Sequence, residues 1–87
     1  MNQETVDREV HELQLVIARL GAPNADGKFE VPFGVLYDAT VDIFEALAGT
    51  LKAAKKRGII AYAAPILLKG SHDKVPITLL VPAPEAH

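Results

Sequence analysis

The chain has 87 residues, a formal net charge of −2 and no cysteine. This length accommodates one domain, which we expect to span residues 1–81 and to be followed by a flexible tail at 82–87. The missing cysteines exclude disulfides and thiol chemistry, while the polar start and the lack of a long apolar run predict a cytoplasmic chain without membrane contact. The acidic balance disfavours nucleic acid as a partner.

The first predicted helix spans residues 4–20. We expect Glu9, Glu12 and Arg19 mostly on its solvent-facing side, and Gly21 at its end. Apolar residues that recur every three or four positions predict its buried side: Val6, Val10, Leu13, Ile17 and Leu20.

A turn, a strand and a short helix are predicted next. The Asp-Gly pair within residues 24–27 favours a turn, because this pair tolerates positive φ. Apolar and polar residues then alternate through Phe29, Val31 and Phe33, which predicts a half-buried strand. Pro32 has no backbone N–H, so the strand should lie at a sheet edge or end there. Residues 34–40 are interpreted as a helical turn or short helix.

Residues 42–57 predict an amphipathic helix with a basic end. Asp42 and Glu45 have the spacing of a capping box, and Gly58 lies where a left-handed residue would end the helix. Its small residues predict close packing of another element: Ala46, Gly49 and Ala53. Its predicted core-facing residues are Ile43, Phe44, Leu47, Leu51 and Ala54.

The last third of the chain predicts strands. Residues 59–62 form one candidate, and residues 66–69 and 75–80 form two more, joined as a hairpin by the Gly-containing loop 70–74. Helix, strand, helices and hairpin in this order define an α+β domain. The order fits a winged helix and also permits other α+β arrangements.

Positive charge gathers at the end of the predicted helix 42–57. Such a cluster can dock on an acidic surface, or it can simply be a solvated helix end that suits the helix dipole. Lys69 and Lys74 would extend the cluster if the predicted hairpin folds back beside the helix. The cluster itself comprises Lys52, Lys55, Lys56 and Arg57.

The sequence offers no constellation typical of an enzyme. Ser71, His72 and Asp73 are adjacent in a turn, where side chains diverge instead of converging as a catalytic triad must, and Asp73 is expected to cap backbone amides. The histidines lack metal-ligand spacing, and no phosphate-binding loop is present. We expect neither cofactor nor metal. Tyr37 and Tyr62 are interpreted as partly buried rings with surface hydroxyls, or as interface anchors.

Three stretches of the chain resemble the Costars family: residues 33–37, 43–57 and 67–73. This family comprises small proteins similar to the C-terminal actin-binding domain of the actin-binding Rho-activating protein. The resemblance implies a winged-helix-like fold, with a small three-helix bundle, a short N-terminal strand and a C-terminal hairpin wing. It implies a noncatalytic monomer of the cytoskeleton that acts on actin dynamics and cell motility. Actin or an actin-regulating protein would then contact the cations, and His72 in its Gly-Ser-His-Asp loop would add a surface contact.

Two other functions stay open on the sequence. A winged helix can bind nucleic acid through a recognition helix, although Asp42 and Glu45 would bring negative charge to the phosphates. The chain can also be an adaptor for a protein other than actin.

Overall fold

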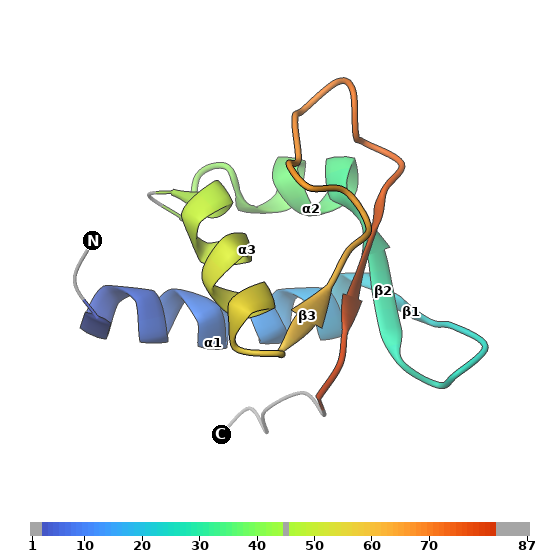
Figure 1. Ribbon diagram of the computed structural model, residues 1–87, viewed down its shortest axis with the longest axis horizontal. Coiled ribbons are helices and arrows are strands. Elements are labelled where there is room, and N and C mark those ends of the chain that lie inside the picture. The colour runs from blue at the N-terminus through green and yellow to red at the C-terminus, as the bar shows by residue number, and fades with distance from the viewer. Residues whose placement is uncertain (1–2, 45, 82–87) are drawn as a thin grey trace.

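The computed structural model describes residues 3–44 and 46–81, and within them it contains three helices and four strands (Figure 1). The predicted tail at 82–87 and Glu45 lie outside the described residues. The α+β class is therefore confirmed. In chain order the elements are α1 (Gln3–Leu20), β1 (Ala22–Pro23), β2 (Phe29–Pro32), α2 (Phe33–Thr40), α3 (Leu47–Lys56), β3 (Ile60–Ala61) and β4 (Pro76–Leu79).

The strands form one antiparallel sheet in the order β1-β2-β4-β3. Val31 pairs with Ile77, and Leu79 pairs with Ile60, so these four buried side chains share one face of the pleated sheet. The strand predicted around Phe29 ends at Pro32 as expected, although β2 is an inner strand of the sheet.

The predicted hairpin between residues 66–69 and 75–80 is wrong. Both edges of β4 are already paired, one with β2 and the other with β3, so residues 66–69 have no free edge of β4 to join. These residues instead belong to a long loop at 62–75, which rises past α2 between β3 and β4 (Figure 1). Its apolar side chains Ile66 and Leu68 are 58% and 50% exposed.

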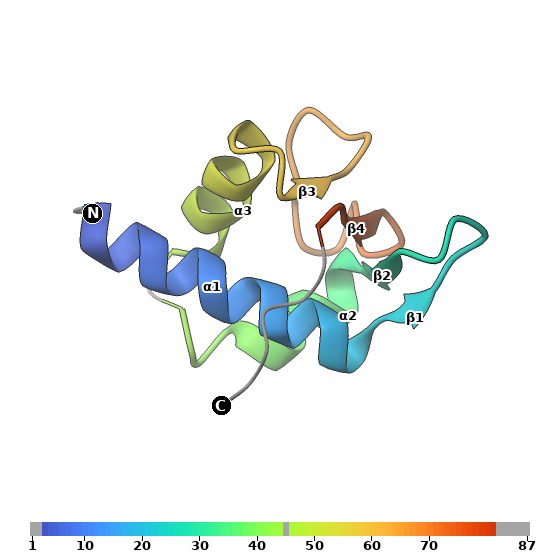
Figure 2. The same ribbon diagram turned by 90° about the horizontal axis from the view of Figure 1, so that it is seen from below.

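Helix α1 crosses the molecule and packs on α3, β2 and β4 (Figure 2). The predicted stripe is buried at Val10, Leu13 and Ile17, whereas Leu20 is 38% exposed. The prediction for Glu9 is wrong: its side chain is buried at 6% exposure, and its Oε1 accepts a hydrogen bond of 2.9 Å from the hydroxyl of Thr50 in α3. Glu9 lies three residues after Val6 and four before Leu13, so helical geometry places it on the buried stripe.

The predicted start of the helix at 42–57 is also wrong, because α3 begins at Leu47. Ala46 occupies the N-cap and no side chain caps it, so the capping box from Asp42 does not form. The backbone turns instead at residues 41–43, where Ile43 N and Phe44 N donate to the carbonyl of Thr40. This turn buries Phe44 and leaves Ile43 54% exposed, so only one of that pair joins the core.

The predicted end of α3 is confirmed. Gly58 has a φ of +74°, and Gly58 N and Ile59 N donate to the carbonyls of Lys55 and Ala54. Glycine tolerates this left-handed conformation without steric cost, which is why the helix ends here. Within residues 3–44 and 46–81, no helix combines the length and the apolar character that a bilayer crossing needs.

Candidate functional site

The four cations at the end of α3 have different surroundings. Lys52 and Lys56 are exposed, and neither forms an ion pair with any other described residue. Lys55 is also exposed, and its Nζ lies 4.2 Å from the centroid of the Tyr62 ring, a cation–π contact. Arg57 reaches back to α1, where its guanidinium lies 2.8 Å from the carboxylate of Asp7. Arg57 therefore joins two helices, while the three lysines face solvent.

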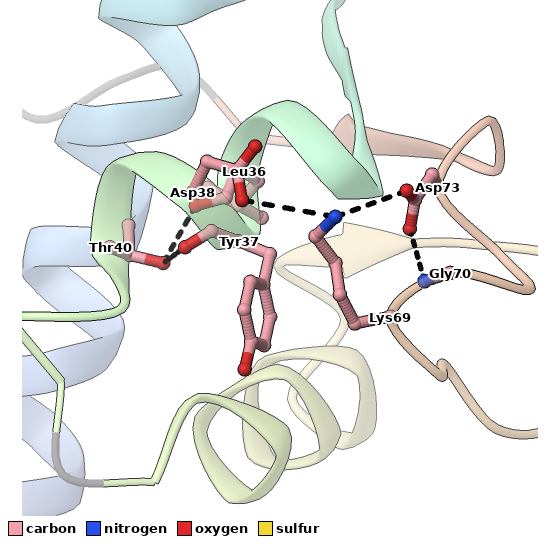
Figure 3. Close-up of polar contacts among 7 residues, drawn as sticks. All are labelled: Leu36, Tyr37, Asp38, Thr40, Lys69, Gly70 and Asp73. Carbon is pink, nitrogen blue, oxygen red and sulfur yellow. Dashed lines mark hydrogen bonds and ion pairs between the residues drawn. The ribbon is translucent and has the colours of Figure 1, made fainter.

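Asp73 holds the 62–75 loop in shape (Figure 3). Its Oδ1 accepts a hydrogen bond of 2.7 Å from Gly70 N, and its Oδ2 accepts one of 3.1 Å from Lys69 Nζ. These bonds, with that from Gly70 as the largest cause, lower the pKa of Asp73 below its usual value. Lys69 also lies 3.8 Å from the carboxylate of Asp38 and 5.8 Å from the Tyr37 ring centroid. The hydrogen bond to Asp73 is the main cause that raises the pKa of Lys69.

The loop is also fastened to the start of α2. No side chain caps this helix; instead Phe33 N and Gly34 N donate to the carbonyls of Val75 and Asp73, each at 2.9 Å. Gly34 permits this approach, since a Cβ on it would lie 2.8 Å from the Cβ of Asp73. Asp73 thus acts through its backbone on α2 and through its carboxylate within the loop.

The neighbouring His72 serves the same turn. Its Nδ1 accepts a hydrogen bond of 3.0 Å from Leu68 N, while Leu68 O accepts from His72 N and Ser71 N. The partners of the Asp73 carboxylate are Gly70 and Lys69, so His72 and Asp73 support the loop separately and do not form the relay of a triad. Among the described residues, no group of three or more His, Asp or Glu side chains is placed to hold a metal ion.

A groove of about 440 Å³ lies between α2, α3 and the loop. Its apolar lining includes Tyr37 from α2, Leu47 and Gly49 from α3, and Leu67 and Leu68 from the loop. Two of the predicted cations, Lys52 and Lys69, lie on this groove, so the structure brings them to one place. Lys74 is exposed outside its lining.

Sequence reasoning missed most of this groove. The apolar run at residues 66–68 indicated a strand, and Gly49 indicated close packing of another element. In the structure Gly49 is exposed on the groove, so the packing prediction for it is wrong. Tyr37 and Tyr62 are partly buried as predicted, and burial raises the pKa of the Tyr62 hydroxyl. The available signal for the groove in the sequence was the presence of lysines, Lys52 and Lys69, together with the aliphatic residues Ile66 and Leu68.

The fold and the groove define the class: a small α+β domain that presents cationic and apolar side chains together on one side. The chain belongs to the Costars family, whose family model matches residues 5–80.

Relatives in animals, plants and amoebae are similar to most of the chain. Costars family protein ABRACL of Mus musculus is 56% identical over 77 residues, which cover 86% of this chain and 95% of that protein. Protein costars of Dictyostelium discoideum is 54% identical over 77 residues, covering 86% and 94%. A Costars family protein of Arabidopsis thaliana is 54% identical over 76 residues, covering 85% and 80%.

A solved structure is similar to the chain as well. The solution structure of human HSPC280 protein has a TM-score of 0.85 and 51% identity, and the match covers 99% of this chain and 100% of that one.

Proposed function

We propose that the chain is a noncatalytic module of the actin cytoskeleton that binds actin filaments, or a factor that controls their turnover. In this role it regulates actin dynamics and cell motility, acting as a monomer in the cytoplasm. Membership of the Costars family supports an actin-related role. The contact would be made by Lys52, Lys55 and Lys56, with Lys69, His72 and Lys74 on the loop as further candidates.

The observation that carries this proposal is the exposed positive face of α3. Lys52 and Lys56 meet no carboxylate among the described residues, and Lys55 lies on an aromatic ring, so their charge is available to an acidic partner. We place Arg57 outside the centre of the contact, because its guanidinium is paired with the carboxylate of Asp7. Charges of this kind raise the association rate and make binding salt-sensitive.

We further describe the domain as winged-helix-like, with the loop at 62–75 in the place of a wing. The support for this description is that the loop connects two antiparallel strands and borders the groove beside α3.

Co-sedimentation with purified actin filaments over a salt series tests the proposal. We expect pelleting at low salt that weakens as salt is added. The triple variant Lys52→Glu, Lys55→Glu and Lys56→Glu should fold normally and stop pelleting. A matched control reverses three exposed cations elsewhere: Arg8→Glu, Arg19→Glu and Lys28→Glu.

The control separates a specific surface from net charge, because both triple variants change the charge equally. Loss of pelleting in both variants would overturn the assignment to α3. No pelleting of the unaltered chain at any salt would overturn direct filament binding, and it would favour action through another protein.

A further inference from the structure

The groove between α2, α3 and the loop combines features that a merely solvated surface lacks. Ile66 and Leu68 are large aliphatic residues at its wall, and both are at least half exposed. Tyr37, Leu47 and Leu67 are partly buried beside them and pack on the core. Large aliphatic side chains at the rim of a hollow gain from contact with another molecule, because such contact removes their surface from water.

The charged side chains in the described lining of the groove are all positive. Lys52 and Lys69 are its charged lining residues, and the described lining contains no carboxylate, although the whole chain carries a net charge of −2. Asp73 and Asp38 offset part of the charge of Lys69 on the loop side. Lys52, on the α3 side, has no such ion pair among the described residues. The groove therefore complements an apolar ligand that carries negative charge.

The lining favours a protein segment as that ligand. Sites for small molecules usually place several fixed polar groups against an apolar floor. Here the polar side-chain groups among the described lining residues are two flexible lysine amines and two tyrosine hydroxyls, and the other side chains of the wall are aliphatic or aromatic, apart from one glycine. Such a wall fits apolar anchor side chains, while lysines at the rim attract flanking carboxylates.

We infer that this groove binds a partner segment in which large aliphatic residues lie between acidic residues. The aliphatic side chains contact Leu47, Ile66 and Leu68, and the carboxylates meet Lys52 and Lys69. This inference deepens the proposed function and rests on it for the identity of the partner. It moves the centre of the contact from the basic end of α3 to the groove.

Titration of the ¹⁵N-labelled chain with three short synthetic peptides tests the groove without actin. The first peptide has two leucines between aspartates and glutamates, the second has lysines in place of the acids, and the third has serines in place of the leucines. We expect the first to shift the amide signals of Leu47, Gly49, Lys52, Leu67 and Leu68. The other two should bind at least about fivefold more weakly, a loss that corresponds to about 1 kcal/mol.

A pair of double variants tests the aliphatic anchors. Ile66→Ser with Leu68→Ser should weaken binding of the first peptide about five- to tenfold. The matched control, Val35→Ser with Ile43→Ser, removes two side chains of similar exposure outside the groove lining, and it should leave the affinity unchanged. Equal binding of the three peptides, shifts outside the groove, no binding, or equal effects of the two double variants would overturn the inference.

The same variants separate this inference from the proposed function in the actin experiment. Pelleting that is lost with the lysine variants and kept with Ile66→Ser and Leu68→Ser would support the basic face and overturn the groove as its contact. Peptide binding in the groove without any actin pelleting would support the groove and overturn direct filament binding.

Discussion

The two sides of α3 contrast sharply. On one side Thr50 and Ala54 are fully buried, and Thr50 bonds to the buried Glu9 of α1. On the other side Gly49 and Lys52 are exposed and line the groove. The first side is closed by packing and a buried hydrogen bond, so it stabilises the fold. The second keeps aliphatic and cationic side chains in water, so its residues can change without loss of the fold.

The largest difference in the free energy of unfolding is expected between substitution of a core leucine and substitution of a groove leucine. Leu13 in α1 is 0% exposed, and Leu13→Ala should lower the free energy of unfolding by about 2–5 kcal/mol through lost burial and a residual cavity. Leu68 is 50% exposed, and Leu68→Ala should change it by about 0.5 kcal/mol or less. Urea unfolding of both variants measures the difference. Equal losses would mean that the groove wall belongs to the core.

The next largest effect is expected from loss of the buried hydrogen bond between Thr50 of α3 and Glu9 of α1. Thr50→Val keeps the shape of the side chain and removes the donor to Glu9, which should cost about 1–3 kcal/mol because a buried carboxylate loses a partner. Thr78→Val is the control, since the hydroxyl of Thr78 lies 3.4 Å from Glu30 at a partly buried site. It should cost under about 1 kcal/mol in the same unfolding assay. A Thr50 variant as stable as the unaltered chain would show that the Thr50–Glu9 hydrogen bond does not stabilise the packing of α1 on α3.

Two helical glycines should respond to alanine with opposite signs. Gly34→Ala places a Cβ 2.8 Å from Asp73, and the resulting overpacking of about 1–3 kcal/mol exceeds the gain in helix propensity of up to about 1 kcal/mol. The net result should be a loss of about 0.5–2 kcal/mol. Gly49→Ala lies on the exposed groove side and should stabilise the domain by up to about 1 kcal/mol. Thermal unfolding of both variants gives the two signs, and a stabilising Gly34→Ala would show that the loop can move away from α2.

The sequence predicts the inner side of the molecule better than the outer side. The stripe through Val10, Leu13 and Ile17 and the stop at Gly58 follow from local rules of helix periodicity and backbone conformation. Glu9 fits the same stripe by spacing, although a carboxylate is usually expected on the solvent-facing side of a helix. Its burial depends on Thr50, which lies 41 residues further along the chain, so local sequence does not reveal that partner.

The structure of the outer side depends on which distant segments pair with the edges of β4. Residues 66–69 have the composition of a strand, but β2 and β3 occupy both edges of β4, and this outcome is not visible from the run itself. The later start of α3 follows from a turn at residues 41–43, where Ile43 N and Phe44 N donate to the carbonyl of Thr40, and the pattern of apolar residues does not indicate this turn. The groove arises only after both outcomes, so the sequence predicted that Lys69 would lie near the cations of α3 only on the condition that a hairpin folds back beside the helix, and it did not predict the groove.

The smallest expected effect is the loss, at low pH, of the hydrogen bonds by which the Asp73 carboxylate stabilises the loop at 62–75. The pKa of Asp73 in the folded chain lies below its usual value of 3.8, first because Gly70 N donates to it and then because Lys69 does. A lowered pKa means that the stabilisation is present above the usual pKa and is lost as pH falls through the folded-state value. Below that value the loop at 62–75 should loosen, while the core of α1 and the sheet persists.

The amide signal of Gly70, followed by NMR from about pH 5 to about pH 2, should titrate with a midpoint below 3.8. Asp73→Asn removes the titrating group and keeps an oxygen that can accept from Gly70 N, so the titration of this signal should disappear. A midpoint at or above 3.8 would show that the hydrogen bonds of Asp73 do not favour its charged form, and that other contacts, such as the backbone bonds to α2, hold the loop beside the groove.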